Sequence, residues 1–202
     1  MHTTMNAVAE FFNTKAAKWD EHNTLSTPEK IDYILKAAGV RNADSVLDIG
    51  TGTGVLLPHI AHRTGVFGSI NAVDISAGML AMAHDKYAGL NCPTQFTLAD
   101  VERDSLYGYY DRIIIYCVYP HLRHPMATLH RLADQNLAAH GTITIAHPIG
   151  REFINAVHSH TEVFSNGLPP ATELAATLAE QGFLPDYIEE SSQIYIVRFR
   201  QA

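Results

Sequence analysis

Three glycines spaced by two residues, Gly50, Gly52 and Gly54, follow the short apolar run 45–49. Glycine lets a chain turn sharply and lets a ligand approach the backbone without a Cβ in the way. A plain turn between a strand and a helix needs one glycine rather than three. The segment therefore predicts a ligand-binding loop, with the carboxylate of Asp48 directly before it.

A second carboxylate, Asp74, stands twenty residues after Gly54, at the end of the next apolar run. In that position it can accept hydrogen bonds from both hydroxyls of a ribose. Ser76 already offers a cap for the helix that follows, which leaves Asp74 for this role. The dinucleotide fingerprint G-x-G-x-x-G has its third glycine one residue later, where this chain has Val55. This mismatch counts against a nicotinamide-dependent oxidoreductase, which is kept as an alternative.

The elements that must position these residues alternate along the chain. Apolar runs predict strands over 45–49, 70–74, 95–99, 111–118 and 141–146, and helical periodicity predicts helices over 28–38, 76–87, 126–138 and 173–181. Alternation of this kind predicts an α/β fold, doubly wound around a mainly parallel sheet. Residues 187–188 and 194–199 are expected to form a closing hairpin, and residues 8–19 an early helix. Ligands of such sheets bind beyond the carboxyl ends of the strands.

Length and charge restrict the class of protein. The 202 residues suggest one domain, residues 1–202. A net charge of -7 disfavours a nucleic-acid partner, because affinity for that backbone rests on many Lys and Arg contacts. We expect no membrane span and no secretory leader. Cys92 and Cys117 form no pair or metal spacing, which favours reduced thiols and a cytoplasmic location.

Four segments resemble the class I S-adenosylmethionine-dependent methyltransferases, in particular the small-molecule group similar to ubiquinone/menaquinone C-methyltransferases. Residues 46–54 match the glycine motif of that family, and 71–76 its ribose motif. Leu98-Ala99-Asp100-Val101 is similar to its third segment, and 11–20 to the part that often folds over the cofactor. The closing strands resemble the family's antiparallel hairpin.

The resemblance implies S-adenosyl-L-methionine as cofactor and a Rossmann-like, seven-stranded sheet with N-terminal helices. Residues 1–40 would then cover the cofactor site. Asp74 would bind the ribose, and Tyr116 would also contact the cofactor. The methionine end and the adenine would be held by the remaining predicted residues: Asp48, Gly50, Thr51, Gly52 and Gly54 for the first, and Ile75, Asp100 and Val101 for the second.

The acceptor of the methyl group must be deduced from the residues after the fourth and fifth strands. Residues 116–120 lack the Asn/Asp-Pro-Pro-Tyr motif of enzymes that methylate amino groups of bases, so a small molecule is expected rather than DNA. His121 and His147 are the candidate catalytic bases, because imidazole titrates in a useful range. Trp19 and Tyr119 are candidate substrate contacts.

If residues 150–160 are helical, Arg151, Asn155 and His158 share one face, opposite 153, 154 and 157. That polar face, next to His147, suits an anionic or hydrogen-bonding acceptor, which Arg151 would orient. The histidines His147, His158 and His160 also permit a metal site, but positions i and i+2 diverge on a helix, and we expect no metal. A cofactor-binding protein without catalysis is the third alternative, and the oligomeric state is left open.

Overall fold

The computed structural model describes residues 7–22, 25–159, 161 and 163–202. Its centre is a seven-stranded sheet in the order β3-β2-β1-β4-β5-β7-β6. The pairs among β1 to β5 are parallel, while β7 pairs antiparallel with both β5 and β6. The expected mainly parallel sheet and its closing hairpin are confirmed. The strands are β1 (Ser45–Ile49), β2 (Ser69–Asp74), β3 (Thr94–Leu98), β4 (Tyr110–Tyr116), β5 (Leu137–His147), β6 (Phe183–Glu190) and β7 (Tyr195–Gln201).

The central strands are apolar on both sides because helices cover both faces of the sheet. Alternate residues of a strand point to opposite faces. In β4, Ile113 and Ile115 pack in one core cluster with α5 (Pro125–Asn136) and α7 (Ala171–Glu180). Ile114 lies in a second cluster with α2 (Pro28–Ala37), α3 (Leu57–Thr64) and α4 (Ala77–Tyr87). All three isoleucines are fully buried, as a doubly wound sheet requires.

Local signals set the helix starts. Thr27 caps α2 by accepting a hydrogen bond from the Lys30 N–H, and Ser76 caps α4 through Met79. The single helix expected over 8–19 is instead divided into α1 (Ala7–Lys15) and a 3₁₀ turn, η1 (Ala16–His22). Tightening of a last turn is common at helix ends. Within the described ranges, no helix has both the length and the apolar character to cross a bilayer.

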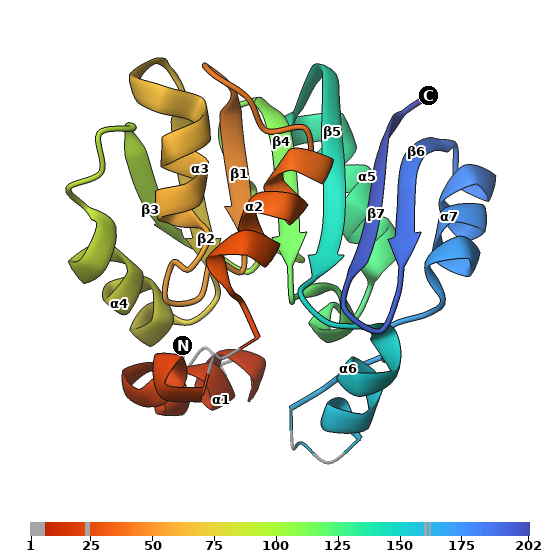
Figure 1. Cartoon of the computed structure of the whole chain (residues 1–202), viewed down its shortest axis with the longest axis horizontal. Coiled ribbons are helices and arrows are strands. Elements are labelled where there is room, and N and C mark those ends of the chain that lie inside the picture. Colours follow the sequence, from red (N-terminus) through yellow and green to blue (C-terminus); the bar gives the residue numbers. More distant parts are fainter. Residues whose placement is uncertain (1–6, 23–24, 160, 162) are drawn as a thin grey trace.

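The carboxyl ends of β1, β2, β4 and β5 meet at one edge of the sheet. Figure 1 shows α1 and α6 (Arg151–His158) beyond this edge, with α1 on the side of α4 and α6 on the side of α7. Strand order reverses between β1 and β4, and such a switch point is where open α/β sheets bind their ligands. The predicted loop and both predicted catalytic histidines lie in segments that leave this edge.

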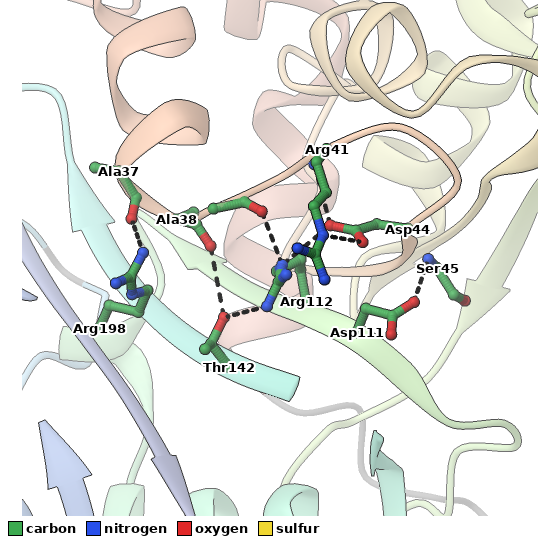
Figure 2. A network of polar contacts seen from close by, with 10 residues as sticks. Ala37, Ala38, Arg41, Asp44, Ser45, Asp111, Arg112, Thr142 and Arg198 are labelled. Atoms are coloured by element: carbon green, nitrogen blue, oxygen red, sulfur yellow. Dashed lines mark hydrogen bonds and ion pairs between the residues drawn. The ribbon is translucent and has the colours of Figure 1, made fainter. Parts of the chain in front are cut away.

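The opposite edge holds a buried polar network (Figure 2). The Arg112 Nε–H donates to the Gly39 carbonyl and lies 3.0 Å from Asp44 Oδ2. Arg198 donates to the Ala37 carbonyl, and Thr142 to that of Ala38. The end of α2 leaves carbonyls without helical partners, and side chains of β4, β5 and β7 bond to them. This network fixes α2 to the sheet, far along each strand from the predicted site.

Candidate functional site

The glycine loop leaves β1 with a backbone that only glycine accommodates easily. Gly50, Gly52 and Gly54 all have positive φ, at 66°, 56° and 88°. A Cβ on Gly50 would lie 2.2 Å from Val118 Cγ2, so the loop also packs closely against the segment after β4. A Cβ on Gly52 would meet no atom within 4 Å, so this glycine borders open space.

Asp74 ties the glycine loop to the end of β2. Its Oδ2 accepts a hydrogen bond from the Gly52 N–H at 2.8 Å, and its Oδ1 accepts one from the Ser76 N–H at 2.8 Å. Burial raises the pKa of this carboxyl, and the backbone hydrogen bonds act in the opposite direction. Each carboxylate oxygen has a second acceptor site, so Asp74 can still receive hydroxyl groups of a ligand.

Asp48 lies beneath the loop and is fully buried. The Thr51 hydroxyl donates to its Oδ2 at 2.7 Å, while Oδ1 has no hydrogen-bond partner among the described residues. Burial raises the pKa of Asp48 to about 7, and the nearby charge of Asp74 adds to the rise. A buried carboxylate oxygen without a partner costs stability, and a cationic group of a ligand would remove that cost.

A cavity of about 770 Å³ is lined by Gly50, Gly52 and Asp74, while Asp48 lies behind the lining. Its wall contains ten of the residues that the sequence predicted for the site. These are Trp19, Gly50, Thr51, Gly52, Asp74, Ile75, Asp100, Val101, Tyr116 and His121. The volume lies in the usual range for a site that encloses a small organic ligand.

The N-terminal segment forms part of the cavity wall and is bonded to the loop region. Asn13 Oδ1 accepts from the Ser76 hydroxyl at 2.7 Å and from the Gly78 N–H at 2.9 Å. Asp20 accepts hydrogen bonds from Thr53 in the glycine loop and from Lys86 in α4. The segment is therefore held by the same elements that carry the glycine loop and Asp74.

His121 is the single histidine among the described residues that line the cavity, and it lies in the turn η3 (Tyr119–His121) after β4. The Phe12 ring stands edge-on to it at 5.5 Å between centroids, and Trp19 packs on Phe12 at 5.5 Å. Burial lowers the pKa of His121, and its hydrogen bond to the Phe164 carbonyl partly offsets this. The imidazole is therefore neutral near pH 7.

His147 and Tyr119 lie outside the cavity lining. Both ring nitrogens of His147 are buried without a hydrogen-bond partner among the described residues. Burial, and then the charges of His158 and His121, lower the pKa of His147 to about 3. Tyr119 is buried in the core cluster under α5 and α7. Gly54 packs against the ring of Tyr87 rather than on the cavity.

Helix α6 forms as expected, but its polar residues contact the protein rather than the cavity. The Arg151 Nε–H donates to Glu190 at 2.9 Å. The Asn155 side chain bonds to both the N–H and the carbonyl of Leu168. His158 pairs with the Ser165 hydroxyl at 2.9 Å, and its ring lies tilted against that of His121. The residue of this helix that lines the cavity is the apolar Val157.

Two contacts at the site carried no signal in the sequence taken alone. Ser26 accepts the hydroxyl of Tyr116 at 2.8 Å, and Phe164 reaches His121 from more than forty residues away. Such contacts depend on the tertiary fold rather than on local spacing. Of the histidines considered for a metal, His160 lies outside the described residues. Within those residues, no three His, Cys, Asp or Glu side chains are grouped as metal ligands would be.

A family model described as a methyltransferase domain matches residues 46–141, which run from β1 through the glycine loop, Asp74 and His121 into β5. Over residues 46–141 the chain is thus similar to this methyltransferase domain family. In the methyltransferase domain, the two motifs that carried the resemblance, 46–54 and 71–76, are adjacent in space through the bond between Gly52 and Asp74. The resemblance to class I S-adenosylmethionine-dependent methyltransferases is thereby confirmed.

Curated relatives of the methyltransferase domain include the ubiquinone/menaquinone biosynthesis C-methyltransferases UbiE of Chromobacterium violaceum and Pseudomonas aeruginosa. The first is 35% identical over 100 residues, which cover 48% of this chain and 41% of the relative. The second is 34% identical over 102 residues, covering 48% and 40%. The matched region of this chain thus spans about two fifths of the length of these relatives.

Solved structures of methyltransferases share the fold. The complex of DhpI with SAH superposes with a TM-score of 0.74 at 17% identity, covering 100% of this chain and 98% of that one. A SAM-dependent methyltransferase from Aquifex aeolicus gives 0.69 at 20% identity, covering 93% and 97%. The Rossmann-like, seven-stranded fold predicted for this chain is confirmed.

S-adenosylmethionine is the cofactor of this family, and the residues present fit it. The unpartnered Asp48 Oδ1 suits a cationic ammonium group, and the open space beside Gly52 is room that a Cβ would fill. Asp74 offers free acceptor sites for hydroxyls at the end of β2. The chain's own geometry therefore provides the charges and the space that such a cofactor requires.

Proposed function

We propose that the protein is an S-adenosylmethionine-dependent methyltransferase that acts on a small-molecule acceptor. The observation that carries this proposal is the composition of the cavity wall, which combines the glycine loop and Asp74 with the aromatic group of Phe12, Trp19 and His121. When bound, the cofactor supplies an electrophilic methyl group. The protein's task is then to position the acceptor and to exclude water.

The cofactor would be held by the residues that the sequence assigns to it. Asp48 and the glycines would bind the methionine end, and Asp74 the ribose. Ile75, Asp100 and Val101 would enclose the adenine, and Tyr116 would form part of the wall. The described part of residues 1–40 would cover the site, a role supported by the bonds of Asn13 and Asp20 to its loops.

The acceptor we propose loses a proton to His121. Methyl transfer needs a general base when the acceptor atom must be deprotonated, as in a hydroxyl, a thiol or an activated carbon. His121 is neutral and lies on the cavity wall, whereas His147 lies behind it. Lys15, Lys18 and Arg123 line the cavity, together with the acidic Asp74, Asp100 and Glu102. These cationic side chains could contact an anionic acceptor, whereas the Arg151 guanidinium is paired with Glu190.

A non-catalytic cofactor-binding protein is the alternative. The open cavity beside His121 favours the enzyme, because a cavity filled by Trp19 or Tyr119 would leave no room for an acceptor. Tyr119 is buried behind the wall, and Trp19 lines the cavity. The open cavity beside His121 thus supports an enzyme rather than a non-catalytic binding protein.

The proposal is tested with cofactor labelled on its methyl group and a panel of phenols, thiols, carboxylates and carbon acids. We expect label transfer to at least one class, and a loss of about 10²- to 10⁴-fold in kcat for His121→Gln. His62→Gln, at an exposed position, is the matched control. Full turnover by His121→Gln, with cofactor affinity unchanged, would reject His121 as the base.

A further inference from the structure

The segment that follows α6 is bonded to the turn that carries His121. The Asn166 N–H donates to the Pro120 carbonyl at 2.8 Å, and its side-chain Nδ2–H donates to the Leu122 carbonyl at 2.8 Å. One residue therefore holds the backbone on both sides of His121. The two segments are more than forty residues apart in the sequence, so this contact is a feature of the tertiary fold.

The same segment contacts the imidazole itself. His121 Nδ1 lies 2.8 Å from the carbonyl oxygen of Phe164. A carbonyl oxygen only accepts hydrogen bonds, so Nδ1 must carry the proton in this contact. In a neutral imidazole the other nitrogen, Nε2, then has the free lone pair.

Further contacts fix the position of the Phe164 carbonyl. The Arg123 guanidinium stacks on the Phe164 ring at 4.2 Å from its centroid. At the other end of the segment, the Asn155 side chain accepts from the Leu168 N–H at 2.7 Å and donates to its carbonyl at 3.0 Å. Three anchors, from α6, η3 and the residue after Leu122, thus hold residues 164–168 against His121.

We propose that Asn166 is a positioning residue that keeps the Phe164 carbonyl on His121 Nδ1 and thereby selects the tautomer in which Nε2 is the base. In the reaction step, the proton of the acceptor passes to Nε2 and the electron pair of its bond stays on the acceptor atom. The resulting imidazolium later loses one proton to water. The use of this lone pair in catalysis rests on the function proposed above, while the tautomer itself does not.

The groups around His121 are compatible with a neutral ring. His158 approaches from α6 at 4.8 Å between ring centroids, Phe12 from α1, and His147 from β5. Arg123 belongs to the segment after η3, and the Glu102 carboxylate accepts from the Arg123 N–H at 3.1 Å. Burial of the ring among these groups lowers the pKa of His121, so the imidazole is neutral near neutral pH.

The tautomer is measured on the full-length protein without any acceptor, by two-bond ¹H–¹⁵N correlation NMR of ¹⁵N-histidine-labelled samples. The signals of His121 are assigned by their loss in His121→Gln. We expect an Nδ1–H ring in the wild type and a mixture with the Nε2–H form in Asn166→Ala. Ser165→Ala, which removes a contact to His158 but leaves the Phe164 bond, should keep the wild-type tautomer.

Once an acceptor is known, Asn166→Ala, which keeps the backbone contact to Pro120 but loses the side-chain bond to Leu122, should lower kcat on the order of tenfold with little change in KM. An Nε2–H ring in the wild type overturns the inference even if Asn166→Ala does not fold. An unchanged tautomer in a folded Asn166→Ala also overturns it. The predicted tautomer, with full turnover by His121→Gln, would reject the base role and leave the role of Asn166 in selecting the tautomer supported.

Discussion

Asp48 is a carboxylate whose fully buried position raises its pKa to about 7. Because the folded pKa lies above the unfolded value, the protonated form is favoured in the folded protein. The contribution to stability is therefore present at low pH and is lost as the pH rises through about 7. A cationic ligand group next to Oδ1 reverses this preference, since it favours the ionised carboxylate.

Affinity for S-adenosylmethionine should consequently rise with pH. With a pKa of about 7, the ionised fraction of Asp48 grows from about one tenth at pH 6 to about nine tenths at pH 8, so we expect a gain of about tenfold. Calorimetric titration at the two pH values measures this gain. Asp48→Asn should bind more weakly and lose the pH dependence, whereas Asp85→Asn, at an exposed position, should retain it. A flat profile in the wild type would contradict the role given to Asp48.

Single residues of the site were predictable where the signal is local. The spacing of Gly50 to Gly54 and the position of Asp74 follow from the chain around them. The bond that joins Gly52 to Asp74 follows from the sheet register and from no local pattern. The hydrogen bond from His121 to Phe164 depends on segments distant in sequence, and nothing in the spacing of either residue indicates it.

At the scale of elements, the N-terminal helix and its 3₁₀ turn are held over the cavity by polar contacts to α4 and the glycine loop. Asn13 bonds to the start of α4, and Asp20 bonds to Thr53 and Lys86. Gly78 also allows α1 to approach α4 closely, because a Cβ at this position would lie 3.2 Å from Asn13 Oδ1. A segment fixed this way opens locally at lower cost than the core.

Asn13→Ala should therefore release the cofactor faster. Loss of two hydrogen bonds at about 1 kcal/mol each predicts an increase in dissociation rate of about 30-fold, with little change in global stability. Stopped-flow displacement of bound cofactor measures the rate, and hydrogen exchange of residues 7–22 reports the opening. Glu10→Gln, at an exposed position of the same helix, is the control. Equal rates for the wild type and Asn13→Ala would show that this contact does not retain the cofactor.

Helix α6 shows where periodicity alone is insufficient. The sequence indicates a polar face and an apolar face, and both exist. The polar face is turned to the protein because Glu190, Leu168 and Ser165 provide hydrogen-bond partners, while Phe153 and Val157 are 49% and 44% exposed. Amphipathicity predicts that two faces differ, and the partners in the fold decide which one is buried.

At the scale of the whole molecule, the ligand cavity and a stabilising polar network lie at opposite edges of one sheet. The carboxyl edge carries the cavity, and the other edge carries the network of Arg112 and Asp44. Strand and helix order was predictable because a sheet covered on both faces requires apolar strands alternating with amphipathic helices. The network was not predictable, since its partners come from α2, β4, β5 and β7.

Arg112→Met should destabilise the fold by about 3–5 kcal/mol, because it leaves the buried Asp44 carboxylate without its main partner. Arg41→Ala is a matched control: Arg41 pairs with the same Asp44, but its side chain is 77% exposed, so about 1 kcal/mol or less is expected. Urea denaturation measures both. Below the unfolding transition, cofactor affinity should be the same in both variants. Equal losses of stability would contradict the assignment.

The central claim, that the glycine loop and Asp74 form an S-adenosylmethionine site, is tested most directly by calorimetric titration with S-adenosylmethionine, with NAD and NADP as comparison ligands. We predict binding of S-adenosylmethionine alone among the three. Asp74→Ala should weaken it by about 10- to 100-fold, because charge-assisted hydrogen bonds are lost. Binding of NAD in place of S-adenosylmethionine, or equal affinity in Asp74→Ala, would contradict the account.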